Sequence, residues 1–136
     1  MELLAAYARE RGVDFVLSAE ARGFVLGGAV AANAGAGFVL ARKPGKLPRE
    51  TASVEYQLEY GVDALEVHSD AIAGGARVLV HDDLLATGGT AAALCDLVEQ
   101  AGGVVAGCAF VVELGFLSGR ERLRGYDVRS LAVYDS

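Results

Sequence analysis

Largely apolar runs alternate along the chain with segments in which apolar residues recur at helical spacing. The runs, each of strand length, cover residues 13–17, 38–41, 78–80, 104–112 and 128–133. The helical patterns cover residues 2–11, 24–34 and 91–101, and a short helical turn is expected near 119–123. Strands that are apolar throughout need cover on both faces, so the alternation predicts an α/β fold: a central, mostly parallel sheet flanked by helices on both sides.

The middle of the chain follows a different pattern. In the segment SVEYQLEYG, valine, tyrosine and leucine occupy every second position, with serine, glutamate and glutamine between them. After an expected turn at residues 61–64, Leu65 and Val67 continue this alternation. A period of two predicts an antiparallel β-hairpin with one polar face, projecting from the parallel core.

The segment RKPGKLPRE, directly before the hairpin, holds both prolines of the chain and the basic residues Arg42, Lys43, Lys46 and Arg49. Proline and glycine among charged side chains oppose regular structure. Together with the hairpin, this segment predicts a flexible flap over about residues 43–68.

Length and charge narrow the class of protein. A chain of 136 residues is long enough for one domain with a substantial core, which we expect to cover residues 1–136. With 12 basic and 18 acidic residues and a net charge of -6, we expect no general nucleic-acid surface, so any anion site must be local. Cys95 and Cys108 lack CxxC spacing and nearby histidines, which indicates buried free thiols in a reducing cytoplasm.

Residues 23–41 contain no charged side chain over 19 positions, which is the length of a membrane-spanning helix. Five of these residues are glycine and one is Asn33, so the stretch divides into a small-residue helix, a turn and a short strand. We therefore expect no contact with a membrane.

The chemistry is predicted at VLVHDDLLATGGT, where a strand, two carboxylates and a loop of small residues precede a helix. Backbone N–H groups at the start of a helix, at the positive end of its dipole, favour a phosphate. Asp82 and Asp83 would repel a phosphate but can accept hydrogen bonds from the vicinal diol of a ribose. The expected phosphate loop consists of Ala86, Thr87, Gly88, Gly89 and Thr90, with the threonine hydroxyls as further donors.

Other motifs fit this segment less well. No lysine follows the glycines as in a P-loop, and no GxGxxG marks a dinucleotide fold. A plain alternative is a tight glycine turn with Thr90 capping the helix and two solvated aspartates. In a receiver domain, two aspartates also lie at a strand end, but the later strand ends here supply neither the acceptor aspartate nor the lysine.

The segment VLVHDDLLATGGT resembles the phosphoribosyl pyrophosphate motif of the type I phosphoribosyltransferases. EARGFVLGGAVA, FVLARKPGKLPRET, YQLEYGVDALEVHSDAI and VVELGFLSGRERL are similar, in order, to the members that act on adenine. The resemblance covers nearly the whole chain. It implies the type I phosphoribosyltransferase fold with a projecting, flexible hairpin flap, and the conversion of adenine and phosphoribosyl pyrophosphate to AMP and pyrophosphate in purine salvage.

The resemblance also implies roles for individual residues. Asp82 and Asp83 would hold the ribose hydroxyls, with Mg2+ nearby and bound mainly by substrate oxygens, and residues 86–90 would hold the 5-phosphate. Glu59 would be the acid/base at the purine, and Tyr60 would close over the reaction centre. The pyrophosphate would be bound by Arg22, Arg42, Lys43 and Lys46, and the base would lie between Phe24 and Leu114.

Members of this family are homodimers and carry a segment upstream of the first helix that forms a hood over the base, and this chain begins after the matching point. His68 and His81 are expected to be structural, although His81 stands where an aliphatic residue usually precedes the aspartates. Two alternatives remain open: a phosphoribosyltransferase for another purine, and a non-catalytic regulator that binds phosphoribosyl pyrophosphate.

Overall fold

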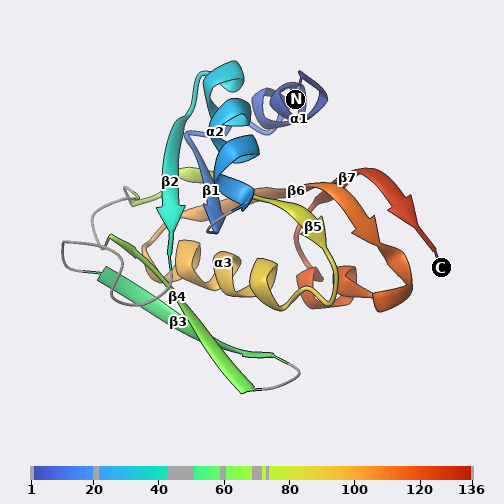
Figure 1. Ribbon diagram of the computed structural model, residues 1–136. Helices are drawn as coiled ribbons and strands as arrows, with labels where there is room; N and C mark the ends of the chain where they lie inside the picture. Colours follow the sequence, from blue (N-terminus) through green and yellow to red (C-terminus); the bar gives the residue numbers. More distant parts are fainter. Residues whose placement is uncertain are drawn as a thin grey trace.

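Figure 1 shows the computed structural model of the chain, which describes residues 2–19, 22–42, 51–58, 61–68, 72 and 74–135. The elements are α1 (Glu2–Glu10), β1 (Phe15–Ala19), α2 (Arg22–Ala34), β2 (Gly37–Ala41), β3 (Thr51–Leu58), β4 (Gly61–His68), β5 (Arg77–Leu85), α3 (Gly89–Gln100), β6 (Val104–Leu114), the 3-10 helices η1 (Gly115–Leu117) and η2 (Gly119–Leu123), and β7 (Val128–Tyr134). Five strands form one sheet in the order β2-β1-β5-β6-β7, and neighbouring strands run parallel. The predicted α/β fold is confirmed.

Helices cover both faces of this sheet (Figure 1). On one face, α1 and α2 pack over a core that includes Val16 of β1 and Leu79 of β5. On the other face, α3 packs over a larger core that includes Val78 and Val80 of β5. Successive side chains of a strand point to opposite faces, so the unbroken apolar run of β5 supplies both cores.

Strands β3 and β4 form the predicted antiparallel hairpin as a separate two-stranded sheet. The expected turn at residues 61–64 is wrong, because Leu58 pairs with Gly61 and residues 61–64 belong to β4. Pairing from that point joins every residue of β3 to a residue of β4, whereas a turn at 61–64 would leave only the residues after 64 to pair. The longer ladder satisfies more backbone N–H and C=O groups.

The hairpin is attached to the main core through β4. Leu65 and Val67 are buried in the core that contains α3, and Figure 1 shows the hairpin on the side of α3 away from the five-stranded sheet. At the end of β2, the N–H of Arg42 donates to the carbonyl of Glu66 at 2.9 Å, and the N–H of Glu66 donates back at 2.7 Å. The flexibility of the flap stays a prediction, and its residues 43–50, 59 and 60 lie outside the described part of the chain.

The uncharged stretch after Arg22 divides as predicted into α2, a turn at Gly35 and β2. In the described part of the chain, no helix has both the length and the apolar character needed to cross a bilayer. The two cysteines are free and buried, as expected, and their Sγ atoms lie 3.7 Å apart between α3 and β6. The contact with Cys108, followed by burial, raises the pKa of the Cys95 thiol, which keeps it protonated.

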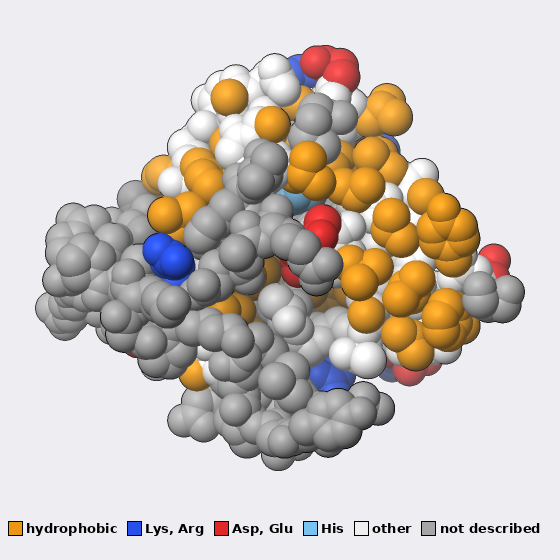
Figure 2. Space-filling model, viewed as in Figure 1, with side chains coloured by type: hydrophobic (Ala, Val, Ile, Leu, Met, Phe, Trp, Pro, Cys, Tyr) orange, Lys and Arg blue, Asp and Glu red, His pale blue; other side chains and the backbone are white. Residues whose placement is uncertain are grey.

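The edge of the five-stranded sheet formed by β7 carries exposed apolar side chains. Figure 2 shows hydrophobic side chains gathered on the side of the molecule that carries β7. The exposed large apolar residues of this region are Phe116, Leu117, Leu131, Val133 and Tyr134. β7 is the edge strand, so its outer side has no neighbouring strand in the five-stranded sheet.

Helix α1 is fixed to the sheet by Tyr7. Its ring is buried, its hydroxyl donates to the carboxylate of Asp127, and the guanidinium carbon of Arg129 lies 4.8 Å from the ring centre. Burial and Asp127 raise the pKa of the Tyr7 hydroxyl, so it remains a donor throughout the neutral range. One side chain thus links the first helix to the segment that enters β7.

We expect Tyr7→Phe to lower the free energy of unfolding by about 1.5–3 kcal/mol, because it removes one hydrogen bond to a charged group and keeps the buried ring. Urea unfolding followed by circular dichroism measures this change. Tyr134→Phe is the matched control, because Tyr134 is exposed at the end of β7. Equal stability of the two variants would contradict the assigned role of the hydroxyl.

Candidate active site

The carboxyl ends of β1, β2, β5 and β6 lie along one edge of the parallel sheet, and the predicted site residues follow these strand ends. Asp82 and Asp83 lie within β5 and not in a loop after a strand ending at Val80, which corrects the expected boundary. The strand is longer because β6 is long: Asp82 pairs with Phe110 and Leu85 pairs with Glu113. In parallel α/β sheets this edge is where ligands bind.

The two aspartates are half-buried and linked to each other. The backbone N–H of Asp83 donates to Oδ1 of Asp82 at 2.8 Å. This contact turns the Asp82 carboxylate toward the backbone that leads to the loop. Two adjacent carboxylates toward the end of a strand offer oxygen acceptors, which suit hydroxyl donors or a cation such as Mg2+.

The loop after β5 leads directly into α3, and the N-cap of this helix is Gly88, with φ of 90° and ψ of 0°. The N–H of Ala92 donates to the Gly88 carbonyl at 2.9 Å as the first helical bond, so the earlier first-turn amides have no intrahelical acceptor. No side chain caps the helix, and its first turn contains no acidic residue. The alternative in which Thr90 caps the helix is therefore wrong, because the N-cap is Gly88 and Thr90 lies inside the helix.

Two glycines allow close contact between this loop and η2. A Cβ on Gly88 would lie 2.6 Å from the carbonyl oxygen of Gly119, and a Cβ on Gly119 would lie 2.9 Å from Cδ1 of Leu85. Gly88 also has a positive φ, which other residues adopt at a cost. The backbone of η2 thus supports the phosphate loop from one side.

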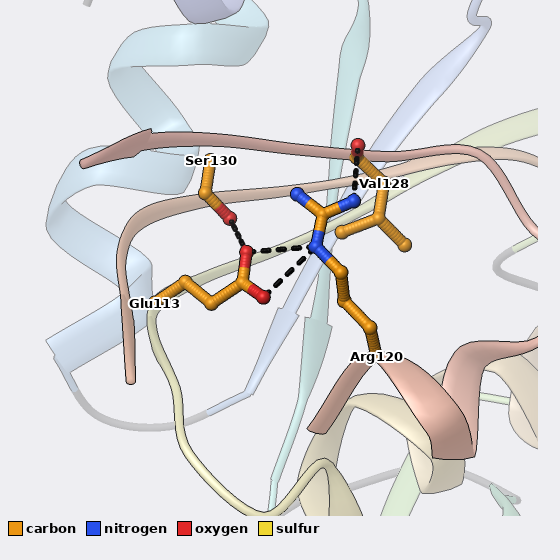
Figure 3. Close-up of polar contacts among 4 residues, drawn as sticks. All are labelled: Glu113, Arg120, Val128 and Ser130. Atoms are coloured by element: carbon orange, nitrogen blue, oxygen red, sulfur yellow. Dashed lines mark hydrogen bonds and ion pairs between the residues drawn. The ribbon is translucent and has the colours of Figure 1, made fainter. Parts of the chain in front are cut away.

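A buried carboxylate lies at the end of β6. Glu113 is 4 % exposed, and Figure 3 shows its carboxylate facing Arg120 and Ser130. Nε of Arg120 donates to Oε1 at 2.9 Å and to Oε2 at 2.8 Å, and the Ser130 hydroxyl donates to Oε1 at 2.8 Å. Nη1 of Arg120 donates to the Val128 carbonyl at 3.3 Å. These contacts join β6, η2 and β7.

Burial by itself raises the pKa of Glu113, but the hydrogen bonds from Arg120 and Ser130 and the charge of Arg120 outweigh burial and leave the pKa below its ordinary value. Glu113 is therefore ionised at neutral pH. A buried charge is tolerated here because it is paired and hydrogen-bonded.

His81 is a second buried polar side chain near the aspartates. Its Nδ1–H donates to the Ala109 carbonyl at 3.0 Å, and among the described residues Nε2 has no hydrogen-bond partner. Burial lowers its pKa, and the bond to Ala109 and the charge of Asp83 only partly oppose this. The imidazole is neutral, which agrees with the structural role expected for it.

Other predicted residues lie at the same edge. Arg22 and Phe24 belong to the first turn of α2, which follows the carboxyl end of β1. Arg42 follows β2 and is half-buried, and Leu114 is the half-buried last residue of β6. Glu59, Tyr60, Lys43 and Lys46 lie outside the described residues. Among the described residues, no three His, Cys, Asp or Glu side chains converge as a metal site.

Sequence reasoning missed the group formed by Glu113, Arg120 and Ser130 and the contact of Gly88 with Gly119. The segment VVELGFLSGRERL contains three of these residues, and the only signal in it is an acidic residue near the end of an apolar run. Pairing across a 3-10 turn has no fixed spacing that a sequence pattern could indicate.

The phosphoribosyl transferase domain matches residues 1–134 of the chain. The match covers nearly the whole chain, and the structure has a helix with a glycine N-cap directly after a strand that carries two aspartates. The chain therefore belongs to the phosphoribosyltransferase family. The adenine phosphoribosyltransferase of Rubrobacter xylanophilus is 64 % identical over 135 residues, which cover 98 % of this chain and 73 % of that protein. Within the family, the chain belongs to the adenine phosphoribosyltransferases.

Solved structures agree with this assignment. The adenine phosphoribosyltransferase of Thermoanaerobacter pseudethanolicus has a TM-score of 0.95 and 53 % identity, covering 98 % of this chain and 77 % of that one. The Saccharomyces cerevisiae enzyme, complexed with an imino-altritol bisphosphate and adenine, has a TM-score of 0.88 and 40 % identity, covering 95 % of this chain and 77 % of that one.

We expect Gly88→Ala to destabilise the protein more than Gly125→Ala, measured by urea unfolding. Both glycines have a positive φ, 90° and 96°, so both changes cost about 1–2 kcal/mol in backbone strain. Only a Cβ at position 88 overlaps the Gly119 carbonyl, whereas position 125 has open space. The overlap adds about 1–3 kcal/mol. Equal losses would show that the loop and η2 are not in close contact.

We expect the stability difference between the wild type and Glu113→Gln to shrink as the pH falls from neutral. The folded pKa of Glu113 is below its unfolded value of about 4.3, so the ionised carboxylate stabilises the protein above that value, and the contribution is lost as the pH falls through the folded pKa. Urea unfolding between about pH 7 and about pH 3 measures this difference. Glu121→Gln, an exposed change on η2, is the control, and a pH-independent difference for Glu113→Gln would exclude the ion pair.

Proposed function

We propose that this chain transfers the 5-phosphoribosyl group of phosphoribosyl pyrophosphate to N9 of adenine, forming AMP and pyrophosphate in purine salvage. The observation that carries the proposal is the pair of aspartates in β5 followed directly by a helix whose first-turn amides have no side-chain cap. The adenine bound in the related Saccharomyces cerevisiae enzyme supports the choice of base.

Ribose 5-phosphate has two chemically different ends, and β5 and α3 offer a matching group to each. Asp82 and Asp83 accept hydrogen bonds from the 2- and 3-hydroxyls. The amides of residues 86–90 and the hydroxyls of Thr87 and Thr90 donate to the phosphate, at the positive end of the α3 dipole. The ribose would then lie along the carboxyl edge of β5.

The site is suited to Mg2+ held mainly by the substrate. Asp82 and Asp83 are hard oxygen ligands, and two carboxylates are too few to hold the ion without oxygens from ribose and pyrophosphate. When bound, Mg2+ supplies positive charge that stabilises the leaving pyrophosphate.

Transfer breaks the bond between the anomeric carbon and the pyrophosphate oxygen and forms a bond from that carbon to N9. Arg22, Arg42, Lys43 and Lys46 stabilise the negative charge that develops on the leaving group. Arg42 follows β2 at the same edge as the aspartates, and its backbone is bonded to Glu66 in the hairpin. Motion of the hairpin would therefore be transmitted to a residue beside the leaving group.

N9 of adenine loses its proton as it attacks, and Glu59 is the proposed acceptor, directly or through the other ring nitrogens. Tyr60 would close over the reaction centre and exclude water, which competes with the base as a nucleophile. Phe24 and Leu114 would pack against the two faces of the purine. Leu114 lies next to the end of β5, because Glu113 pairs with Leu85.

Two other functions make different demands on the same residues. An enzyme for another purine would use the same ribose site but select an oxopurine. A non-catalytic regulator would keep Asp82, Asp83 and Thr90 but would not need Glu59. We further propose a homodimer in the cytoplasm, as the family resemblance implies, and sedimentation of the purified chain tests the dimer.

With adenine, phosphoribosyl pyrophosphate and Mg2+, we expect the purified chain to form AMP, and to form little product with hypoxanthine, guanine or xanthine. Separation of the nucleotides by chromatography measures this. Product from an oxopurine alone would reassign the base. Binding of phosphoribosyl pyrophosphate with no turnover of any base would support the regulator.

We expect Asp83→Ala and Glu59→Ala to lose turnover by at least about 10²-fold, the low end for a group acting in general acid–base catalysis. Calorimetry should show that Glu59→Ala still binds phosphoribosyl pyrophosphate, whereas Asp83→Ala binds it weakly, because Asp83, unlike Glu59, is proposed to contact the ribose. Asp96→Ala, an exposed change on α3, is the control. Full activity of Glu59→Ala would remove Glu59 from the reaction.

A further inference from the structure

We propose that Glu113 and Arg120 are positioning residues for the substrate 5-phosphate. Their ion pair holds η2 against the loop before α3 and so places the amides that bind the phosphate. This inference rests on the function proposed above, because it assigns the same loop to the 5-phosphate. Neither residue would touch the substrate.

The first part of the argument is the geometry of the pair. Both carboxylate oxygens of Glu113 accept from the same nitrogen of Arg120, at 2.9 and 2.8 Å. The Glu113 side chain is 5 % exposed and that of Arg120 is 49 % exposed, so a half-exposed cation is fixed by a buried anion (Figure 3). Ser130 and the Val128 carbonyl hold the same two groups from β7. Arg120 is therefore held at three points and has little freedom to move.

The second part is the connection from Arg120 to the phosphate loop. Gly119 is adjacent to Arg120, and its carbonyl lies against Gly88, the N-cap of α3. The space between them does not admit a single Cβ at position 88. A shift of Arg120 therefore moves Gly119, and either the loop follows or a gap opens beside it.

The third part is the place of the pair relative to β5. Glu113 is paired in the sheet with Leu85, the last residue of β5 before the loop. The carboxylate is thus anchored to the same strand end from which the loop departs. The ion pair completes a closed series of contacts: Leu85 pairs with Glu113, and Glu113 binds Arg120. Arg120 is next to Gly119, which packs on Gly88 in the segment that follows Leu85. A closed series of this kind defines the position of the loop more closely than the strand end alone.

Amide donors to a phosphate need accurate placement, because the strength of a hydrogen bond depends steeply on its distance and angle. Because the N-cap of α3 is a glycine, no capping side chain can change its rotamer to restore the hydrogen bonds of the amides if the loop moves. If the pair only held β7 to the sheet, its loss would lower stability and leave phosphate affinity unchanged. These two roles are therefore separable by experiment.

The experiment compares Glu113→Gln and Arg120→Met with the matched controls Glu121→Gln and Arg124→Met, which change exposed side chains in and next to η2. Calorimetry measures the Kd for ribose 5-phosphate, and steady-state assays measure the KM for phosphoribosyl pyrophosphate, the KM for adenine and kcat. Thermal unfolding reports stability. Arg120→Lys, which keeps the charge but offers a single nitrogen centre, tests for partial rescue.

We expect both test variants to raise the Kd for ribose 5-phosphate and the KM for phosphoribosyl pyrophosphate by about 10-fold, less than the ~10²-fold that a 1 Å misplacement can cost. The KM for adenine should change little, the controls should match the wild type, and Arg120→Lys should recover part of the affinity. The double variant should be no worse than the more affected single variant, because the two residues act through one contact.

Unchanged Kd and KM values in folded variants, whatever their melting temperatures, would overturn the inference. If Glu113→Gln does not fold, Arg120→Met and Arg120→Lys decide the question, because Arg120 is half-exposed. A wild-type chain that binds ribose 5-phosphate but forms no AMP would refute the proposed function while the Kd values still test the ion pair. A wild-type chain with neither activity would refute both.

Discussion

The architecture depends on the central position of β5, which is hydrogen-bonded to β1 on one side and β6 on the other. Because helices cover both faces, the buried run of residues 78–80 must be apolar, and the charged residues of β5 lie on either side of it: Arg77 at the amino end, and Asp82 and Asp83 toward the carboxyl end. Asp82 and Asp83 are half-buried just after the fully buried run 78–81, and after Leu85, which is buried again in the core beneath α3, the chain leaves the sheet for the loop and α3. The position of the candidate site is thus set by how far the two cores extend.

The carboxyl edge of the sheet contains partly or fully buried carboxylates, whose burial is unfavourable unless they are hydrogen-bonded. Asp82 and Glu113 lie toward the carboxyl ends of β5 and β6, and both carboxylates accept hydrogen bonds. Asp82 accepts from the backbone of Asp83, and Glu113 accepts from Arg120 and Ser130. His81 remains neutral in the same region because burial lowers its pKa. The buried carboxylate of Glu113 thus joins three backbone segments, whereas the half-buried Asp82 and Asp83 lie where the proposed function places the ribose.

Much of this could be predicted from the sequence because it depends on local patterns. The apolar runs and helical spacings predicted the α/β alternation, and DDLLATGGT indicated a sugar phosphate site through the chemistry of its residue types. Boundaries were less accurate. The end of β5 depends on the length of β6, and the hairpin turn depends on which register pairs the most residues, and neither is encoded in a single segment.

The group around Glu113 could not be predicted, for a related reason. Glu113, Arg120 and Ser130 come from three elements, and their contact exists only once η2 folds back across the end of β6. The same holds for Gly88 and Gly119, since a glycine in a turn has the same sequence signal whether or not another backbone packs on it. Contacts that cross from one loop to another need the fold before they can be recognised.

The uncapped start of α3 has a consequence for folding as well as for binding. A helix whose N-cap is glycine lacks the side-chain oxygen that ordinarily accepts a hydrogen bond from one of its first amides, although glycine in this position costs only about a few tenths of a kcal/mol relative to such a side chain. An anion bound at the loop supplies that missing acceptor, so the ligand completes the secondary structure of the protein. Under the proposed function, a ligand that fills this place therefore adds to the stability of the whole domain, and the gain grows with the logarithm of its concentration above the Kd.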